Sequence, residues 1–302
     1  VLHLKAIHPM RFGTKLDGED GWGARMGPLF GGRRQFFAWL REAGFGFIEF
    51  SCGDEPRVDM IADYARACAD AGLGVSLHPY TTTGSPEGFG VGPVEELTRG
   101  LLDLADRLAD IAGRPQRVVL HAGLARTGPY ALDYDEAMAR ARDYFQWLDE
   151  EVRVHHPDVL ALCETAMPAE PRDDFERLAD TWDTVLQIVE DTDIGICWDT
   201  GHAFLSAAYG KHDQTPPDRF LERVRHVHMH DVVAGKGGAG DLSDHHPPGQ
   251  GISPLQEYGR RLAGSGYDGW VLFERSAYLY GDRASLRQAL EPGMQMLREI
   301  FG

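Results

Sequence analysis

Short runs of apolar and β-branched residues alternate along the chain with longer segments in which apolar residues recur every three or four positions. The short runs are typical of buried strands, and the longer segments are typical of helices with one apolar face. The expected strands are Leu2–Ile7, Phe45–Phe50, Gly74–His78, Arg117–His121, Val159–Glu164, Ile194–Asp199, Val224–His228 and Trp270–Glu274. The clearest expected helices are Val58–Ala71, Val94–Ile111 and Phe175–Glu190.

Strand–helix units of roughly 30 to 45 residues, repeated eight times, are what a (β/α)8 TIM barrel requires. The pattern therefore predicts an α/β protein with a single barrel of this type. A doubly wound open sheet is the alternative, but the Gly-x-Gly-x-x-Gly turn that such a sheet places after its first strand is missing. Because no proline-, serine- or glycine-rich linker interrupts the alternation, we expect residues 1–302 to form one domain.

Two connections are longer than the alternation needs, and both are rich in glycine. Pro9–Gly32 follows the first expected strand, and Val232–Gly251 follows the seventh. Long loops of this kind are either surface insertions or lids over an active site. We expect lids if reactive side chains lie beside them.

The chain has 302 residues, with 30 Lys and Arg against 47 Asp and Glu, which gives a formal net charge of −17. This charge argues against a nucleic acid or an anionic membrane surface as a partner of the whole molecule. The sequence contains neither a run of about 18 apolar residues nor a signal-peptide pattern, so we expect no membrane span and no export. The four cysteines are far apart, which fits a reducing compartment and predicts a cytoplasmic protein.

Reactive side chains gather at the ends of the expected strands, where the active site of a TIM barrel lies. Consecutive strands end in His78, His121, Glu164, Asp199, His228 and Glu274. Carboxylates that converge on one mouth repel one another and need a cation, and imidazole nitrogens are ligands that zinc, manganese and cobalt accept. The sequence therefore predicts an enzyme with a divalent metal centre.

Several local motifs resemble those of the xylose isomerase-like TIM barrels, a superfamily of sugar isomerases and epimerases that also contains endonuclease IV. They are Trp198-Asp199-Thr200-Gly201-His202, His226-Val227-His228-Met229-His230-Asp231, Gly249-Gln250-Gly251-Ile252 and Glu274. The resemblance extends from the first expected strand to the eighth. It implies a metal site made by Glu164, Asp199, His228 and Glu274. In the epimerase members the two glutamates also move the substrate proton, so Glu164 and Glu274 are the expected catalytic residues.

Three histidines alternate along one expected strand, so His226, His228 and His230 share the face that points into the barrel. His228 is the expected ligand because it lies three residues before Asp231, as in the His-x-x-Asp pattern of the resembling family. We interpret His226 as a barrel-core residue and His230 as a substrate contact. Asp231 is expected to contact the substrate or to fix the tautomer of a ligand.

Further histidines resemble the positions at which endonuclease IV holds additional zinc ions: His78, His121, His202 and His245. That family has Asp-x-His before its Gly-x-Gly turn, whereas this chain has Ser243 two residues before His245. Asp244 or Asp241 would have to substitute. The resemblance therefore implies one divalent ion, manganese, zinc or cobalt, and leaves open up to three.

Two activities are compatible with such a centre. As an isomerase or epimerase, the protein would act on a sugar or sugar derivative by proton transfer through a metal-stabilised enediolate, with His202 orienting a hydroxyl. As a polynuclear zinc phosphoester hydrolase, it would attack a small phosphodiester or phosphomonoester rather than DNA. The isomerase or epimerase is favoured because an acidic chain does not repel a neutral sugar.

Candidate substrate contacts lie on the long loops and beside the strand ends. Trp22 is a candidate for stacking on a sugar, as are Phe89 and Trp198. Lys236, Arg275 and Arg126 are candidates for contacting a phosphate. A small-molecule carbohydrate or phosphoester is the expected partner, and a homo-oligomer is left open.

Overall fold

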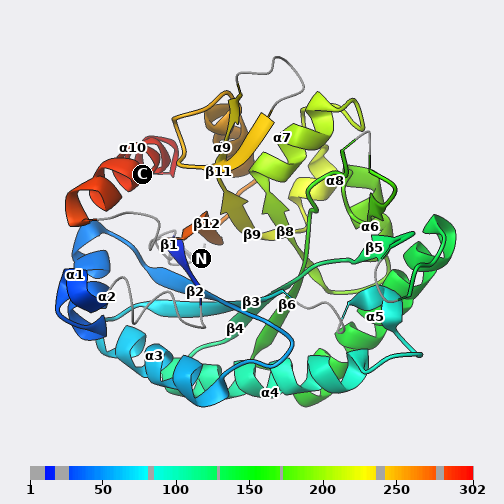
Figure 1. The fold of residues 1–302 in the computed structure, drawn as a ribbon, viewed down its shortest axis with the longest axis horizontal. Coiled ribbons are helices and arrows are strands. Elements are labelled where there is room, and N and C mark those ends of the chain that lie inside the picture. The colour runs from blue at the N-terminus through cyan, green and yellow to red at the C-terminus, as the bar shows by residue number, and fades with distance from the viewer. Residues whose placement is uncertain are drawn as a thin grey trace, which may run out of the picture.

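Eight parallel strands close into a barrel within the part of the chain that the computed structural model describes, residues 11–17, 27–80, 85–127, 130–170, 173–235, 242–276 and 282–301 (Figure 1). In order around the barrel they are β1 (Arg11–Asp17), β12 (Trp270–Ser276), β9 (Val224–Met229), β8 (Gly195–Asp199), β6 (Val159–Glu164), β4 (Gln116–Leu120), β3 (Gly74–Pro79) and β2 (Phe47–Cys52). Because β1 pairs with both β2 and β12, strands from the two ends of the sequence complete the closure. The predicted (β/α)8 TIM barrel is confirmed.

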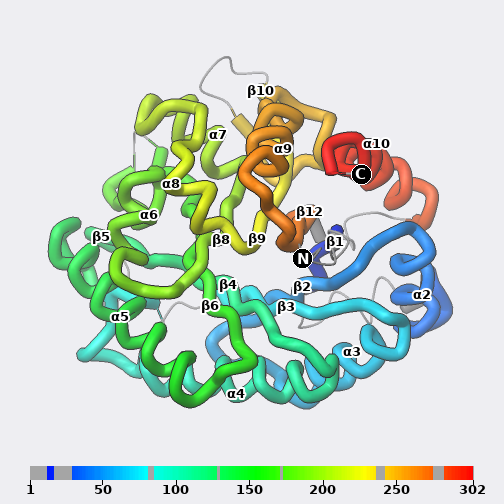
Figure 2. The backbone as a smooth tube through the Cα atoms, turned by 180° about the vertical axis from the view of Figure 1, so that it is seen from behind, coloured from blue at the N-terminus to red at the C-terminus, as the bar shows by residue number. Residues whose placement is uncertain are grey.

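Helices cover the outside of the barrel, as the ribbon and the reverse view in Figure 2 show. They are α1 (Gly27–Phe30), α2 (Arg33–Ala43), α3 (Val58–Asp70), α4 (Val94–Ala112), α5 (Tyr134–His155), α6 (Trp182–Ile188), α7 (Thr200–Ala208), α8 (Asp218–Leu221), α9 (Leu255–Gly264) and α10 (Arg283–Phe301). Short elements lie between them: the 3-10 turn η2 (Pro86–Gly88) and the strands β5 (Leu124–Ala125), β7 (Glu176–Arg177), β10 (Asp231–Ala234) and β11 (Leu242–His246). None of the described helices is both long enough and apolar enough to cross a membrane.

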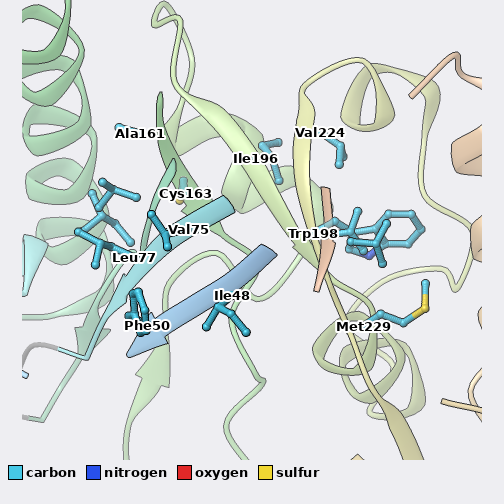
Figure 3. Packing of buried hydrophobic residues seen from close by; sticks show 14 of the residues in the cluster. Ile48, Phe50, Val75, Leu77, Ala161, Cys163, Ile196, Trp198, Val224 and Met229 are labelled. Atoms are coloured by element: carbon cyan, nitrogen blue, oxygen red, sulfur yellow. The ribbon is translucent and has the colours of Figure 1, made fainter. Parts of the chain in front are cut away.

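Alternate residues of each barrel strand point outward and form the main hydrophobic core with the helices. Figure 3 shows these outward residues on neighbouring strands, among them Ile48 and Phe50 of β2 and Val75 and Leu77 of β3. All four side chains are buried. The apolar stripes of the helices therefore pack against one half of every strand, which leaves the other half free to fill the barrel interior.

The inward-facing residues change from apolar to polar along the barrel axis. Near the start of the strands, two separate apolar clusters fill the interior, and they consist of Phe47, Trp270 and Leu272, and of Val119, Leu162 and Cys197. Two residues further along the strands, the inward positions carry Glu49, Glu164, Asp199, His228 and Glu274, all of them buried. The apolar base thus closes one end of the barrel and directs the polar groups toward the other end.

The first barrel strand is Arg11–Asp17. The prediction that Leu2–Ile7 forms this strand is therefore wrong. Leu2–Ile7 itself lies outside the described residues. The observed strand falls within Pro9–Gly32, which we expected to be a loop. It lacks an apolar run because its inward positions are Gly13 and Lys15. A Cβ at position 13 would collide with the ring of Phe47, so the packing there requires glycine.

The ends of the other seven predicted strands are confirmed to within two residues. One predicted helix and one predicted loop differ from the structure. The helix expected over Phe175–Glu190 begins only at Trp182, because Thr181 and Thr184 form a reciprocal capping box that fixes its start. The segment before it forms β7. The long loop expected over Val232–Gly251 contains the antiparallel strands β10 and β11 at its two ends.

We predict that Thr181→Ala destabilises the protein by about 1 kcal/mol, because the first turn of α6 loses the side-chain acceptor for the Thr184 N–H. Urea denaturation followed by circular dichroism measures the change. Thr181→Ser keeps the hydroxyl and should retain most of the stability. Equal stability of Thr181→Ala and the unmodified protein would show that the capping box does not define this helix start.

Candidate metal centre

The carboxyl ends of six barrel strands bring the predicted ligands together at one mouth of the barrel. The residues are His78 on β3, His121 directly after β4, Glu164 on β6, Asp199 on β8, His228 on β9 and Glu274 on β12. Except for His121, these side chains are buried, with at most 2 % exposed. Residues that are up to 196 positions apart in the sequence therefore share one small volume because the parallel strands end together.

Two carboxylates approach the same imidazole nitrogen at the centre of this mouth. His228 Nδ1 lies 2.7 Å from Glu164 Oε1 and 3.3 Å from Glu274 Oε2. Burial alone would raise the pKa of both carboxyl groups, but the His228 charge and the neighbouring histidines outweigh burial and hold both pKa values well below the usual range. The two carboxylates thus remain ionised side by side.

The donor set of this centre fits a divalent metal ion. One ligand atom from each of His78, Glu164, His228 and Glu274 lies within 4.8 Å of all the others. Among the described residues, the buried atoms Glu164 Oε2, Glu274 Oε2 and His78 Nε2 make no well-oriented hydrogen bond. Such atoms are costly to bury unless a cation binds them, and mixed carboxylate and imidazole ligands suit zinc, manganese or cobalt.

Hydrogen bonds to backbone carbonyl groups fix the tautomers of two histidines at the centre. His78 Nδ1 lies 3.1 Å from the Val119 carbonyl oxygen, and His202 Nδ1 lies 3.1 Å from the Thr165 carbonyl oxygen. Because a carbonyl only accepts, each Nδ1 carries the proton and each Nε2 keeps its lone pair. Burial, only partly offset by Glu164, lowers the pKa of His78 to about 4, so this ring is neutral and able to bind a metal.

Glu164 also has two further histidines beside its second oxygen. Glu164 Oε2 lies 3.3 Å from His78 Nε2 and 2.9 Å from His121 Nε2. The three residues resemble the start of a second ligand set. His121 is more than one-third exposed, so its side of the centre opens toward solvent.

Asp199 lies next to the centre but is engaged by other residues. Its Oδ1 accepts a 2.7 Å hydrogen bond from the His202 backbone N–H, which caps the start of α7. Its two oxygens lie 3.0 and 3.1 Å from His230 Nε2. Asp199 shares a group of closely spaced donor atoms with Glu164 and His202, and another with His230 and Glu274. The structure therefore places Asp199 between the predicted metal centre and two other histidines, His202 on α7 and His230 directly after β9.

The tautomer of His230 is fixed by its two partners. The backbone N–H of His245 donates to His230 Nδ1 at 2.9 Å, so this nitrogen is the acceptor and the proton lies on Nε2. Nε2 then donates to Asp199. Gly201 makes room for this arrangement, because a Cβ at that position would collide with the His230 ring. Both nitrogens of His230 are thus occupied within the protein.

His245 is charged and paired in the structure. Its ring stacks on that of His230 at 4.2 Å, and its Nδ1 lies 3.2 Å from Asp244 Oδ1. Burial opposes the charged ring, but the Asp244 and Glu274 carboxylates outweigh it and raise the pKa of His245 to about 10. Ser243, which stands where endonuclease IV has an aspartate, bonds to His246 Nε2 at 3.0 Å. A further metal ion at His202, His245 and Asp244 would have to displace the Asp244–His245 pair.

Asp231 stabilises the turn after β11, and no contact to a substrate is needed to explain it. Its carboxylate accepts backbone N–H bonds of 2.8 to 3.0 Å from Val232, Gly249, Gly251 and Ser253. The side chain is 1 % exposed. A Cβ at Gly251 would collide with the Asp231 carboxylate and the Val232 carbonyl, which accounts for the glycine of the Gly-x-Gly turn. The prediction of Asp231 as a substrate contact is therefore not favoured by the structure.

The remaining predicted substrate contacts lie outside the described residues, on the surface or in the hydrophobic core. Trp22 and Lys236, together with Asp241, lie outside the described residues, as does the side chain of Arg275. Arg126 is exposed and pairs with Glu176 at 3.3 Å. Trp198 packs in the core against Trp182, Phe220 and Tyr258, and Phe89 packs against Tyr144 and Trp147, so these two aromatic side chains are not stacking platforms for a sugar.

Glu49 is a buried acid that the sequence reasoning missed. Its Oε2 accepts bonds from Ser76 Oγ at 2.9 Å and from His226 Nε2 at 3.2 Å, and its Oε1 lies 3.0 Å from His228 Nε2. Glu49 thereby turns Nδ1 of His228 toward Glu164 and Glu274. The available signal was a single acid inside the apolar strand Phe47–Cys52. His226 lies in the barrel core beneath the centre, where we expected it.

Tyr80 and Lys15 were also missed, and both contact Glu274. Tyr80 Oη donates to Glu274 Oε1 at 3.0 Å and accepts from Lys15 Nζ at 2.6 Å. Lys15 Nζ also lies 3.5 Å from Glu274 Oε1. Lys15 belongs to the strand that the sequence analysis placed elsewhere, and Tyr80 comes two residues after the predicted strand end His78. These two groups hold the outer oxygen of Glu274, while its other oxygen faces His228.

A cavity of about 260 Å³ opens beside the centre. Its lining residues are Tyr80, Ser85, His121, Ala122, Gly123, Leu124, Ala166, Met167, Arg177, His202, His245 and Glu274. The volume is just below the range of about 300 to 1,000 Å³ that is common for small-molecule sites. A larger cavity of about 1010 Å³ lies elsewhere, beside α6, α7 and α8, and contains none of the predicted ligands.

Comparisons with known proteins agree with this architecture. A family model described as the xylose isomerase-like TIM barrel matches residues 37–300. A search of curated protein sequences gives no match. Among solved structures, D-psicose 3-epimerase from Clostridium cellulolyticum H10 is similar with a TM-score of 0.66 and 14% identity, over 97% of this chain and 99% of that chain.

Two further solved structures show the same fold. L-ribulose 3-epimerase has a TM-score of 0.65 and 18% identity, over 96% of this chain and 95% of that chain. An AP endonuclease, family 2, from Brucella melitensis has a TM-score of 0.58 and 19% identity, over 95% of this chain and 98% of that chain. Identities this low establish the shared fold and leave the reaction to be argued from the site.

We predict that Glu49→Gln weakens binding of zinc or manganese by about 10- to 100-fold, because the carboxylate that orients His228 is replaced by a neutral group. Competition with a chromophoric chelator measures the affinity, and circular dichroism checks folding. Glu42→Gln changes an exposed glutamate on α2 and serves as the matched control. Unchanged metal affinity in a folded Glu49→Gln protein would contradict the role of Glu49.

Proposed function

Because this chain belongs to the xylose isomerase-like TIM barrel family, we propose that it is a metal-dependent enzyme that isomerises or epimerises a sugar or sugar derivative. The observation that carries the proposal is the convergence of Glu164 and Glu274 on His228 Nδ1, at 2.7 and 3.3 Å, from two different strands. A pair of carboxylates on either side of one centre is the arrangement needed to remove a proton from carbon and to return one.

The residues of the centre have complementary tasks in such a reaction. A divalent ion held by Glu164, His228 and Glu274, with His78 or Asp199, would polarise the substrate carbonyl and make the adjacent C–H bond acidic. One glutamate, as the carboxylate, would take that proton from carbon, and the other glutamate, after it has itself gained a proton, would give that proton to the same or the neighbouring carbon. Tyr80 and Lys15 hold the Glu274 carboxylate through its outer oxygen.

A histidine beside the cavity can orient the substrate. His202 keeps a lone pair on Nε2, because its Nδ1 donates to the Thr165 carbonyl, and this nitrogen can accept a hydrogen bond from a substrate hydroxyl. The cavity that His202 lines also reaches Glu274. The similarity in fold to D-psicose 3-epimerase and L-ribulose 3-epimerase adds support for sugar chemistry.

A polynuclear phosphoester hydrolase is the second candidate. It is favoured by the approach of both His78 and His121 to Glu164 Oε2, and by the group formed by His202, His230 and His245. The fold similarity to an AP endonuclease of family 2 is compatible with it. Against it, both nitrogens of His230 are bonded within the protein, and His245 is paired with Asp244.

Metal stoichiometry separates the two candidates. We expect elemental analysis of the metal-loaded protein to give one divalent ion per chain, and His121→Ala to retain that ion. Activity of His121→Ala should fall by less than about tenfold, because His121 lies at the exposed side of the centre. Two or three zinc ions per chain, with loss of both metal and activity in His121→Ala, would support the hydrolase instead.

The two glutamates should be separable by isotope exchange. We expect Glu164→Gln and Glu274→Gln each to slow sugar interconversion by about 10²- to 10⁴-fold, because one of two proton-transfer groups is lost. Nuclear magnetic resonance in deuterium oxide, with a panel of ketoses, follows deuterium incorporation at carbon. Each variant should still exchange the proton that faces the remaining glutamate.

Glu176→Gln is the control for these variants, since Glu176 is only partly buried, lies on β7 and pairs with Arg126 outside the centre. It should interconvert sugars at the rate of the unmodified protein. Full activity of either Glu164→Gln or Glu274→Gln would rule out the proton-transfer role of that residue.

A further inference from the structure

A single permanently charged cation lines the cavity beside the metal centre in the part of the chain that the structure describes. This residue is Arg177, and the same cavity wall includes Glu274, His121 and His202. The sequence reasoning considered Arg126 as an anion contact but not its spatial neighbour Arg177. The position of Arg177 therefore raises the question of what its guanidinium binds.

The backbone around Arg177 is held firmly. Arg177 lies on β7, which pairs antiparallel with β5 so that Arg177 is opposite Leu124. The next residue, Leu178, donates its backbone N–H to the Gly123 carbonyl at 3.1 Å. Gly123 and Leu124 themselves line the cavity. The two short strands thus fix the point from which the Arg177 side chain enters the cavity wall.

Arg177 on β7 and Arg126 directly after β5 have opposite surroundings although β5 and β7 are paired. Arg126 is exposed and pairs with Glu176 at 3.3 Å. Arg177 is half-buried, and its buried Nε makes no hydrogen bond to any residue that the structure describes. Among the described residues, no carboxylate oxygen lies within 4.0 Å of the Arg177 guanidinium nitrogens. The guanidinium carbon lies 5.5 Å from the centroid of the Phe175 ring.

A guanidinium in this setting is matched by an anionic ligand. Removing an arginine from water without a hydrogen-bonding partner is unfavourable, and a planar guanidinium binds carboxylate or phosphate groups through paired N–H bonds. Asp173 and Asp244 lie near enough to favour the charged form but do not pair with it. The geometry leaves donor groups of Arg177 available at the cavity that contains Glu274.

We propose that Arg177 binds an anionic group of the substrate, a phosphate or a carboxylate, so that the preferred substrate is an acidic sugar. This inference rests on the proposed function, because it assumes that the sugar occupies the cavity beside the metal centre. Arg177 selects the substrate and positions it, and it takes no part in the proton transfer by Glu164 and Glu274.

Calorimetric binding to the metal-loaded full chain tests the proposal with three related sugars: D-fructose, D-fructose 6-phosphate and D-fructuronate. We expect at least one of the two anionic sugars to bind about tenfold or more tightly than D-fructose. Arg177→Ala should remove this preference and change the affinity for D-fructose by less than about threefold. The anionic sugar that loses affinity identifies phosphate or carboxylate as the recognised group.

Two further variants keep the result interpretable. Arg177→Gln preserves the length of the side chain and should lose the preference as Arg177→Ala does, with circular dichroism showing that both variants fold. Arg126→Ala removes the neighbouring cation that pairs with Glu176, and it should keep the preference. If the unmodified protein binds all three sugars equally, or if folded Arg177 variants keep the preference, the proposal is overturned.

The outcome is independent of whether the proposed reaction is correct, because binding does not require turnover. A preference that depends on Arg177, combined with no deuterium exchange into any sugar, would support the anion site and overturn the proposed reaction. Exchange into D-fructose with no preference for its acidic derivatives would do the reverse.

Discussion

The central constraint on this structure is the burial of several carboxylates inside one barrel. Glu49, Glu164, Asp199 and Glu274 lie at inward positions of four strands and have at most 2 % of their surface exposed. Carboxylates in such surroundings are stable only when cations or hydrogen-bond donors compensate them. The arrangement of histidines on the neighbouring strands follows from this requirement, because each histidine lies beside at least one of the four acids.

The compensation is built in two layers along the barrel axis. In the deeper layer, Glu49 Oε2 accepts hydrogen bonds from Ser76 and His226, and Glu49 Oε1 lies 3.0 Å from His228 Nε2. In the upper layer, Glu164 and Glu274 share His228 Nδ1, and within the described part of the chain each still has an oxygen that makes no hydrogen bond. The deeper layer is therefore a support that orients His228, and the upper layer is the part that calls for an external cation.

Much of the fold could be predicted from the sequence because seven strands are apolar on their outward side and six of these end in a reactive residue. β1 could not, since Gly13 and Lys15 occupy its inward positions for reasons that only the Phe47 ring and Glu274 explain. The convergence of Glu164, Asp199, His228 and Glu274 followed from the rule that strand ends meet. Glu49 was missed because an acid within an apolar strand acquires its meaning from His226 and His228 on the opposite side of the barrel. Arg177 was missed because its segment has helical periodicity, whereas Thr181 delays the helix.

The hydrogen bond from the His245 backbone to His230 links the geometry of a loop to the position of the proton on the His230 ring. His245 has a left-handed backbone conformation, with φ of +54°, at the end of the hairpin formed by β10 and β11. That conformation aims an N–H at His230 Nδ1, and the His230 proton consequently points at Asp199. A hairpin that shifted by a single residue would move this N–H away from Nδ1, and the donation from His230 to Asp199 would then no longer be fixed. The length of the hairpin is therefore constrained at its base, where His245 must keep its position for its N–H to reach His230.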